Sequence, residues 1–283
     1  MKMKKLLVSL GLIASIAVPT VVSSPTQNAK AATKTMKVHF IDVGQGDSIY
    51  IKAPNGEDII IDGGNKDGSD VVAYLKKQKV DDIEVMVSTH PDADHVGGLD
   101  EVLKAYRVQS VYAPKVSHTT QAYKDFLIAV QKERLKINTV TAGKTLNIKG
   151  VKAVFVAPVK SYSKSDLNNW SAVLHMTYNK NSFLFTGDAE LKSESDMLAS
   201  KRTLKADVLK VSHHGAKETT SANFLKAVKP KYAVISAGKK NSYGHPTSPV
   251  LSRLKQAKAS VYRTDQKGDI MITSDGKKLS VKY

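Results

Sequence analysis

The stretch Thr89-His90-Pro91-Asp92-Ala93-Asp94-His95 decides the fold of this chain. It follows directly on an apolar, strand-like run at residues 83–88 and holds four potential metal ligands, namely His90, Asp92, Asp94 and His95. Imidazole nitrogens and carboxylate oxygens bind divalent cations and leave positions open for water. A strand that ends in such a cluster fixes its ligands on a rigid edge. An ordinary polar surface loop can have the same composition, so the prediction of a hydrolytic two-metal site depends on this stretch together with the clusters that follow it.

Two later strand ends carry the same residue types. Asp188 follows the apolar run at residues 183–185, and His213 and His214 follow the run at residues 208–211. Taken singly, a Gly-Asp pair is a common turn and paired histidines are often found on surfaces. Three strand ends that terminate in Asp or His converge naturally at one edge of a sheet sandwich. We therefore expect these side chains to meet in one site, with Asp188 placed to bridge two metals.

The N-terminal segment is typical of a secretory signal peptide. A lysine-rich start precedes the apolar run at residues 6–18, and Ala29-Lys30-Ala31 offers a cleavage site. That run is about 13 residues long, which is too short to span a bilayer. We expect a signal peptide over residues 1–31, cleavage near Ala31, and a secreted protein with no stable membrane anchor.

Composition limits the possible partners and cofactors. The chain has 283 residues, a formal charge of +17 and no cysteine, so disulfides and thiolate metal sites are excluded. Residues 1–31 hold four lysines and no acidic residue, which leaves +13 on the mature chain. Such a surplus favours polyanions such as nucleic acid or teichoic acid, or anionic surfaces, although some secreted proteins are simply basic.

Strand-like and helix-like stretches alternate without a long linker through residues 32–283, which indicates a single domain. The two similar β-rich halves with interspersed helices predict an α/β (α+β) fold, a four-layer αββα sandwich. The expected strands include Lys37–Asp42, Ser48–Ala53, Asp58–Ile61, Val151–Ala157, Ala172–Tyr178 and Ser182–Thr186, and the expected helices include Asp70–Gln78 and Gln121–Lys132.

The chain resembles the metallo-β-lactamase fold superfamily, whose signature reads H-x-H-x-D-H. The similarity is closer to the extracellular nuclease-like domain of the competence protein ComEC and its secreted stand-alone relatives. The segments that carry it are residues 40–48, 61–64, 88–98, 168–171, 186–189, 209–215 and 241–246. The chain departs from the general pattern at Asp92, where His is usual. The superfamily pattern also has a third-cluster histidine, and this chain has no clear counterpart near Asn169 and Ser171, where it would be expected. His175 follows in an apolar strand, where it fits the core better than a metal site.

The resemblance implies two divalent metal ions, Zn²⁺ or Mn²⁺ with Mg²⁺ possible. One ion would be held by His90, Asp92 and Asp188. The other would be held by Asp94, His95, Asp188 and one residue of the His213/His214 pair. His214, the residue just before glycine, is the favoured ligand, which leaves His213 for substrate or for supporting a ligand. Carboxylate-rich sites shift the preference from Zn²⁺ toward Mn²⁺ or Mg²⁺.

The resemblance also implies substrate-contacting residues. Asp94 would orient the metal-activated water, and Lys210 and His245 would assist catalysis on a phosphodiester. The expected substrate-binding residues are Asn169, Ser171, Asn241 and Tyr243. Each has a structural alternative, because Lys210 can be a plain strand-end lysine and residues 243–246 a structural turn. Asp62 is expected to stabilise its own turn.

These observations predict a secreted metal-dependent hydrolase, a phosphodiesterase or nuclease acting on extracellular DNA. The alternatives are another extracellular phosphoester hydrolase of the teichoic acid or phosphorylcholine type, a carboxylic-ester or lactone hydrolase, and a catalytically weak polyanion-binding protein. The sequence leaves the oligomeric state unknown, and does not separate DNA from RNA.

Overall fold

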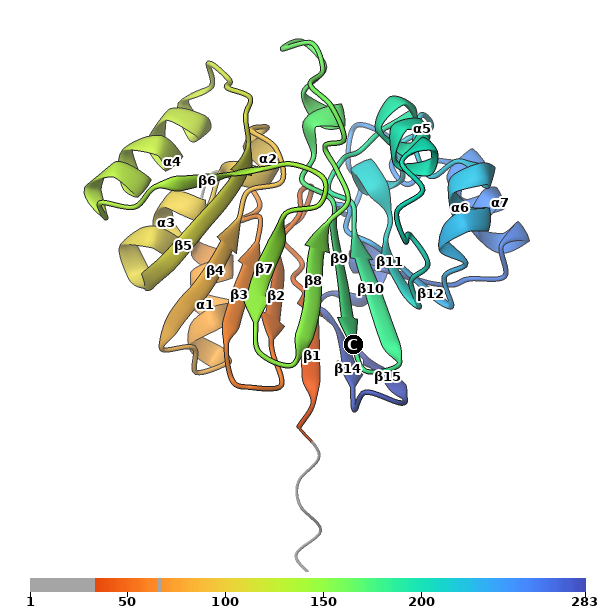
Figure 1. Cartoon of the computed structure of the whole chain (residues 1–283), viewed down its shortest axis with the longest axis horizontal. Helices are drawn as coiled ribbons and strands as arrows, with labels where there is room; N and C mark the ends of the chain where they lie inside the picture. The colour runs from red at the N-terminus through yellow and green to blue at the C-terminus, as the bar shows by residue number, and fades with distance from the viewer. Residues whose placement is uncertain (1–33, 66–67) are drawn as a thin grey trace, which may run out of the picture. The chain divides into compact units, whose positions relative to one another are not determined.

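Two mixed β-sheets form the centre of the fold (Figure 1). The computed structural model describes residues 34–65 and 68–283, so the predicted signal peptide lies outside the described residues. The first sheet has the strand order β15 (Leu279–Lys282), β14 (Ile270–Ser274), β1 (Met36–Phe40), β2 (Ile49–Lys52), β3 (Asp58–Ile61), β4 (Asp82–Val87), β5 (Arg107–Pro114) and β6 (Ile137–Val140). The second has the order β13 (Ser260–Arg263), β12 (Tyr232–Ile235), β11 (Val208–Lys210), β10 (Asn181–Phe185), β9 (Leu174–Tyr178), β8 (Val151–Phe155) and β7 (Thr145–Ile148).

Helices cover the outer face of each sheet, which confirms the predicted αββα arrangement (Figure 1). The first sheet carries α1 (Ser69–Lys77), α3 (Leu99–Ala105) and α4 (Gln121–Lys132). The second carries α5 (Leu191–Ala199), α6 (Ala222–Val228) and α7 (Ser248–Gln256). The short elements are α2 (Ala93–Val96), α8 (Thr264–Lys267) and the 3₁₀ turns η1 (Leu167–Trp170) and η2 (Ser212–Gly215). Among the described residues, no helix has both the length and the apolarity needed to cross a bilayer.

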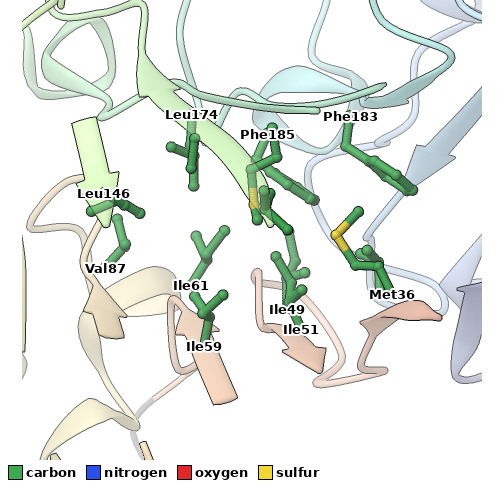
Figure 2. Close-up of a cluster of buried hydrophobic side chains, with 14 of the residues drawn as sticks. Met36, Ile49, Ile51, Ile59, Ile61, Val87, Leu146, Leu174, Phe183 and Phe185 are labelled. Atoms are coloured by element: carbon green, nitrogen blue, oxygen red, sulfur yellow. The ribbon is translucent and has the colours of Figure 1, made fainter. Parts of the chain in front are cut away.

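Side-chain alternation explains why the central strands read as continuous apolar runs. In β3, Ile59 and Ile61 point into the core between the sheets, whereas Ile60 points outward under the helices. In β10, Phe183 and Phe185 enter the same inter-sheet core and Leu184 faces the other helix layer. Figure 2 shows Ile59 and Ile61 of the first sheet pointing toward the layer that holds Phe183 and Phe185 of the second. A strand covered on both faces needs apolar residues at every position.

The structure has two features that the sequence did not predict. The C-terminal meander crosses between the sheets, because β13 joins the second sheet whereas β14 pairs antiparallel with β1 in the first. Strands β6 and β7 were not expected, since their short sequences mix exposed polar residues with few buried ones. Strand partners far apart in sequence are set by tertiary packing, which local patterning does not report.

Phe183 is fully buried in the inter-sheet core. We expect Phe183→Ala to lower the free energy of unfolding by about 3–5 kcal/mol, because it removes a buried ring and leaves a cavity. Urea denaturation measures this change. The matched control is Ile128→Ala on α4, where the side chain is 47% exposed and the expected change is below about 0.5 kcal/mol. Equal losses in the two variants would contradict this account of the core.

His39 makes stability depend on pH. Its ring is buried on the outer face of β1, with Nδ1 2.8 Å from the Tyr74 hydroxyl. Burial, assisted by Lys37, lowers the pKa of His39 from 6.5 to about 4. As the pH falls, His39 therefore becomes protonated near pH 6.5 in the unfolded chain but only near pH 4 in the folded chain. Stability is fully present above pH 6.5 and falls by about 2–3 kcal/mol from this residue as the pH drops to 4.

Urea titrations of the native protein and of His39→Gln at several pH values measure this contribution. The variant is expected to lose less stability than the native protein between pH 6.5 and 4. Identical pH slopes for the two proteins would show that His39 does not supply this dependence.

Candidate metal centre

The carboxyl ends of parallel strands bring the predicted ligands together. Strands β3, β4 and β5 run parallel in the first sheet, and β10, β11 and β12 run parallel in the second. The segment from His90 to His95 follows β4, Asp188 follows β10, and η2 follows β11. Ligand sites of α/β sheets lie at this edge, where strands end and loops begin. Each sheet thus supplies about half of the site.

The carboxylate of Asp188 is the centre of the cluster. Its Oδ2 atom lies 3.2 Å from Nε2 of His95, 3.6 Å from Nε2 of His214, 3.7 Å from Nε2 of His213 and 4.0 Å from Nε2 of His90. Both histidines of the 213–214 pair therefore face Asp188. His214 is buried, whereas the His213 side chain is 26% exposed.

Two further carboxylates complete the cluster. Asp94 Oδ2 lies 3.2 Å from His214 Nε2 and 4.0 Å from His95 Nε2. Asp92 Oδ2 lies 3.4 Å from His90 Nε2. These two Asp side chains are about a third exposed, whereas Asp188 is buried, so they form the side of the cluster that solvent reaches.

The opposite ring nitrogen of each buried histidine is held by a second residue. His95 Nδ1 donates to Asp62 Oδ2 over 2.8 Å, and His214 Nδ1 donates to the Ser236 carbonyl over 3.0 Å. A carbonyl oxygen only accepts hydrogen bonds, so the Nδ1 of His214 carries a proton, and Nε2 is the nitrogen that faces Asp94 and would bind a metal. Such support fixes the ring orientation and raises ligand basicity.

Asp62 organises the first half of the site through hydrogen bonds to Thr89 and His95. It accepts hydrogen bonds from the backbone N–H of Thr89 at 2.7 Å and from the Thr89 hydroxyl at 2.6 Å, besides that from His95. The Thr89 oxygen in turn lies 3.1 Å from His90 Nδ1. The expectation for Asp62 was therefore too narrow, because this carboxylate orients a ligand histidine.

The charges of the cluster are mutually stabilised. Burial alone raises the pKa of Asp188, but His95 and His214 lower it to well below its usual range. Burial alone lowers the pKa of His214, but Asp188, Asp47 and Asp94 raise it to about 9. The site thus stabilises positive charge among buried carboxylates, as a cation-binding site must.

The donor set fits divalent cations. Nε2 of His90, Nε2 of His95 and Oδ1 of Asp188 are buried without a hydrogen-bond partner. Buried polar atoms are rarely left unpaired, so these three require a ligand. Among the described residues, three groups of donor atoms lie close enough together to hold a metal, and all three share His95: His90 with Asp188, Asp94 with His214, and Asp47 with Asp62. Imidazole and carboxylate donors suit Zn²⁺ and Mn²⁺.

Lys210 is not where its predicted catalytic role requires it. Alternation along β11 turns its side chain into the space between the sheets, where it is fully buried. Its Nζ lies 2.6 Å from Asp47 Oδ2 and donates to the Val211 carbonyl over 3.0 Å. Asp47 Oδ1 lies 3.4 Å from His214 Nδ1. Lys210 is therefore a positioning residue that neutralises Asp47 beneath the site, and it does not reach a substrate.

Asp47 was missed as a site residue, although it ends the Gly44-Gln45-Gly46-Asp47 turn. Burial raises its pKa, but Lys210 and His214 outweigh that effect and hold the pKa well below the usual range. The turn lies close to the cluster of His and Asp side chains around Asp188, called the metal cluster below, because Asp47 N–H donates to the Asp94 carbonyl. A side chain on Gly46 would collide with the same carbonyl. Gly-Gln-Gly-Asp between two strands was the only signal of this role in the sequence.

Three predicted substrate-binding residues have structural roles instead. Asn169 Oδ1 accepts from the backbone N–H groups of Glu190 and Ser193, which fixes the start of α5. Ser171 Oγ accepts from the N–H of Asp188 over 3.0 Å and so positions the central carboxylate. Both are buried. The side-chain amide of Asn241 forms hydrogen bonds within its own loop, to the backbone of Gly238 and His245.

His175 does not supply the missing third-cluster histidine. It lies on β9, and its Nε2 donates to the Lys205 carbonyl over 2.8 Å. His175 is therefore a residue of the strand and not a metal ligand, as its apolar sequence context indicated. His213 also faces the cluster, with its Nε2 3.7 Å from Asp188 Oδ2. Its Nδ1 lies 3.4 Å from Glu190 Oε1, an acceptor that the sequence did not reveal.

His245 and Tyr243 lie beside the cluster. The His245 ring centroid is 5.6 Å from that of His213 and 6.5 Å from that of His214. Tyr243 stacks on His245 and is 67% exposed. Both are therefore near enough to contact a substrate bound at the cluster.

Asp62→Asn tests the support of His95. It preserves size but removes the charge that fixes the imidazole, so we expect metal affinity to fall about 10- to 100-fold. Competition with a chromophoric chelator for Mn²⁺ or Zn²⁺ measures it. The matched control is Asp125→Asn on the surface of α4, which should leave affinity as it was. Native affinity in folded Asp62→Asn would remove Asp62 from the site.

Comparison with known proteins agrees with this geometry. The model of the Metallo-beta-lactamase superfamily matches residues 41–239. The chain is 33% identical over 252 residues to ComE operon protein 3 of Bacillus subtilis, covering 83% of this chain and 32% of that protein. It is 30% identical over 230 residues to Competence protein ComA of Neisseria gonorrhoeae, covering 80% of this chain and 30% of that protein.

The chain thus spans about a third of the length of these curated relatives. The crystal structure of the metallo-beta-lactamase fold protein YhfI from Bacillus subtilis superimposes with a TM-score of 0.57 at 12% identity. It covers 85% of this chain and all of that one, which supports the fold alone. The chain therefore belongs to the metallo-β-lactamase superfamily of metal-dependent hydrolases and is related to its competence proteins.

Proposed function

We propose that this protein is a secreted metal-dependent phosphodiesterase that cleaves extracellular DNA. The observation that carries the proposal is the buried Asp188 carboxylate, whose Oδ2 faces four imidazole nitrogens from both sheets. A carboxylate shared in this way is suited to bridging two cations. When bound, the two cations supply a water of lowered pKa and polarise a phosphoryl oxygen.

The protein's own residues divide the remaining work. Asp94 presents a partly exposed carboxylate beside His214, so its oxygen is placed to orient the attacking water and accept its proton. His90, His95 and His214 are buried and exclude bulk water from the ligand side of the site. This separation directs the open side, at Asp92 and Asp94, toward the substrate.

His245 is the residue of this chain best placed to contact the scissile phosphate. Burial and the neighbouring His213 and His214 lower its pKa, which favours the neutral ring. Its Nδ1 is buried without a hydrogen-bond partner. A neutral imidazole can donate one hydrogen bond to a phosphoryl oxygen and stabilise developing charge there.

Charge and kinship favour DNA among phosphodiesters. The net charge of +13 on residues 32–283, which is +17 for the whole chain less four lysines in residues 1–31, draws polyanions to the protein. The relatives include a protein named for competence, the uptake of DNA. Zn²⁺ and Mn²⁺ fit the imidazole-carboxylate set, and Asp92 in place of a histidine moves the preference toward Mn²⁺ or Mg²⁺.

Incubation of residues 32–283 with single- and double-stranded DNA and Mn²⁺, Mg²⁺ or Zn²⁺ tests the proposal. We expect cleavage that needs an added cation and stops with EDTA. Asp94→Ala, His95→Ala and Asp188→Asn should lower the rate at least about 100-fold, because each removes a proposed ligand. Asp125→Asn is the matched control and should cleave at the native rate.

Absence of DNA cleavage by the folded, metal-loaded protein would contradict the proposed DNase activity. Hydrolysis of bis(p-nitrophenyl) phosphate or teichoic acid under the same conditions would then identify another phosphoester hydrolase. Activity only on carboxylic esters or lactones would reject phosphoester chemistry altogether.

A further inference from the structure

A column of aromatic rings leads out of the metal cluster to the solvent. The His214 ring lies nearly parallel to that of His245, with centroids 6.5 Å apart and an interplanar angle of 27°. His245 in turn stacks on Tyr243, with centroids 5.7 Å apart and an angle of 23°. The column thus begins at a buried residue that faces Asp188 and ends at an exposed tyrosine.

The loop that carries the outer two rings is held in place. Asn241 Oδ1 accepts from His245 N–H, and its Nδ2 donates to the carbonyls of Gly238 and His245. Thr247 donates from its N–H and its hydroxyl to the Gly215 carbonyl, which ties the loop to η2. The rings therefore do not depend on a ligand for their arrangement, and little ordering is needed when one binds.

The outer face of Tyr243 has no aromatic partner among the described residues. The side chain is 67% exposed, the largest exposure among the large hydrophobic residues described. One exposed aromatic residue is ordinary on a protein surface. This one extends a stack that starts beside the metal cluster, so its open face continues a path for a flat ligand group.

We propose that Tyr243 is a stacking platform for a nucleobase next to the phosphodiester bound at the metal cluster. The inference rests on the proposed function, because it supplies the base of the strand whose phosphate lies at the cluster. Base–aromatic stacking tolerates every base, so the platform gives no sequence preference. Bases inside a duplex already stack on their neighbours, and the platform selects a strand with an unpaired base.

The test compares binding of two single strands to the metal-loaded protein by fluorescence anisotropy, with phosphorothioate linkages in both strands to prevent cleavage. One is a labelled thymidine oligonucleotide, and the other has the same backbone with abasic residues throughout. Tyr243→Ala is expected to weaken binding of the thymidine strand about 5- to 100-fold, with the loss absent from the abasic strand. Tyr243→Phe keeps the ring and should bind both strands like the native protein.

Tyr283→Ala is the matched control, since Tyr283 is 60% exposed at the C-terminal end of the chain. Its affinity for the thymidine strand should equal that of the native protein. An equal loss in Tyr243→Ala and Tyr283→Ala would overturn the proposal, as would equal losses on the two strands. If Tyr243→Ala binds the thymidine strand like the native protein and metal-dependent DNA cleavage is observed, the stacking role of Tyr243 is wrong and the proposed nuclease activity is supported. Selective loss in Tyr243→Ala without any hydrolysis would sink the nuclease and leave the platform.

Discussion

The site depends on the electrostatic interaction between the buried carboxylate of Asp188 and the histidine side chains around it. A buried charge is tolerated only when partners compensate its lost hydration. Here the partners are imidazoles that approach from both sheets, and their own raised pKa values show that the carboxylates stabilise positive charge in return. Removing one partner leaves the others uncompensated. The strand ends that carry these residues are therefore held together by electrostatics as well as by packing.

The inter-sheet core sets the spacing that this arrangement needs. Ile59, Ile61 and Val87 of the first sheet and Phe183 and Phe185 of the second belong to one apolar core between the sheets. At the site end, the apolar core gives way to the Asp47–Lys210 ion pair, which joins the β1–β2 turn to β11 across the two sheets. A buried pair of this kind contributes little net stability compared with apolar residues of equal size. Its value lies in fixing Asp47 against His214.

Strand-end ligands were predictable because they follow apolar runs, and runs of this kind were located well. The strand Asp58–Ile61 and the helix Gln121–Lys132 have the predicted bounds. The direction of a single side chain was less accessible. Lys210 and Asn169 looked like substrate contacts from their motifs, yet alternation and backbone hydrogen bonds turn both inward. Motifs report which residues gather at a site, whereas their division between substrate and scaffold depends on tertiary packing.

The His213-His214 pair shows why two neighbours face one carboxylate. In an extended strand, successive side chains point to opposite faces. Both histidines instead have left-handed backbone conformations, with φ of 47° and 52°. Such conformations cost about 1–2 kcal/mol for each residue that is not glycine. They persist because Glu190 and the Ser236 carbonyl hold the two rings while Asp188 attracts both Nε2 atoms. The turn at η2 thus brings both rings to the same oxygen, but of the two only His214 belongs, among the described residues, to a group of donor atoms close enough to hold a metal.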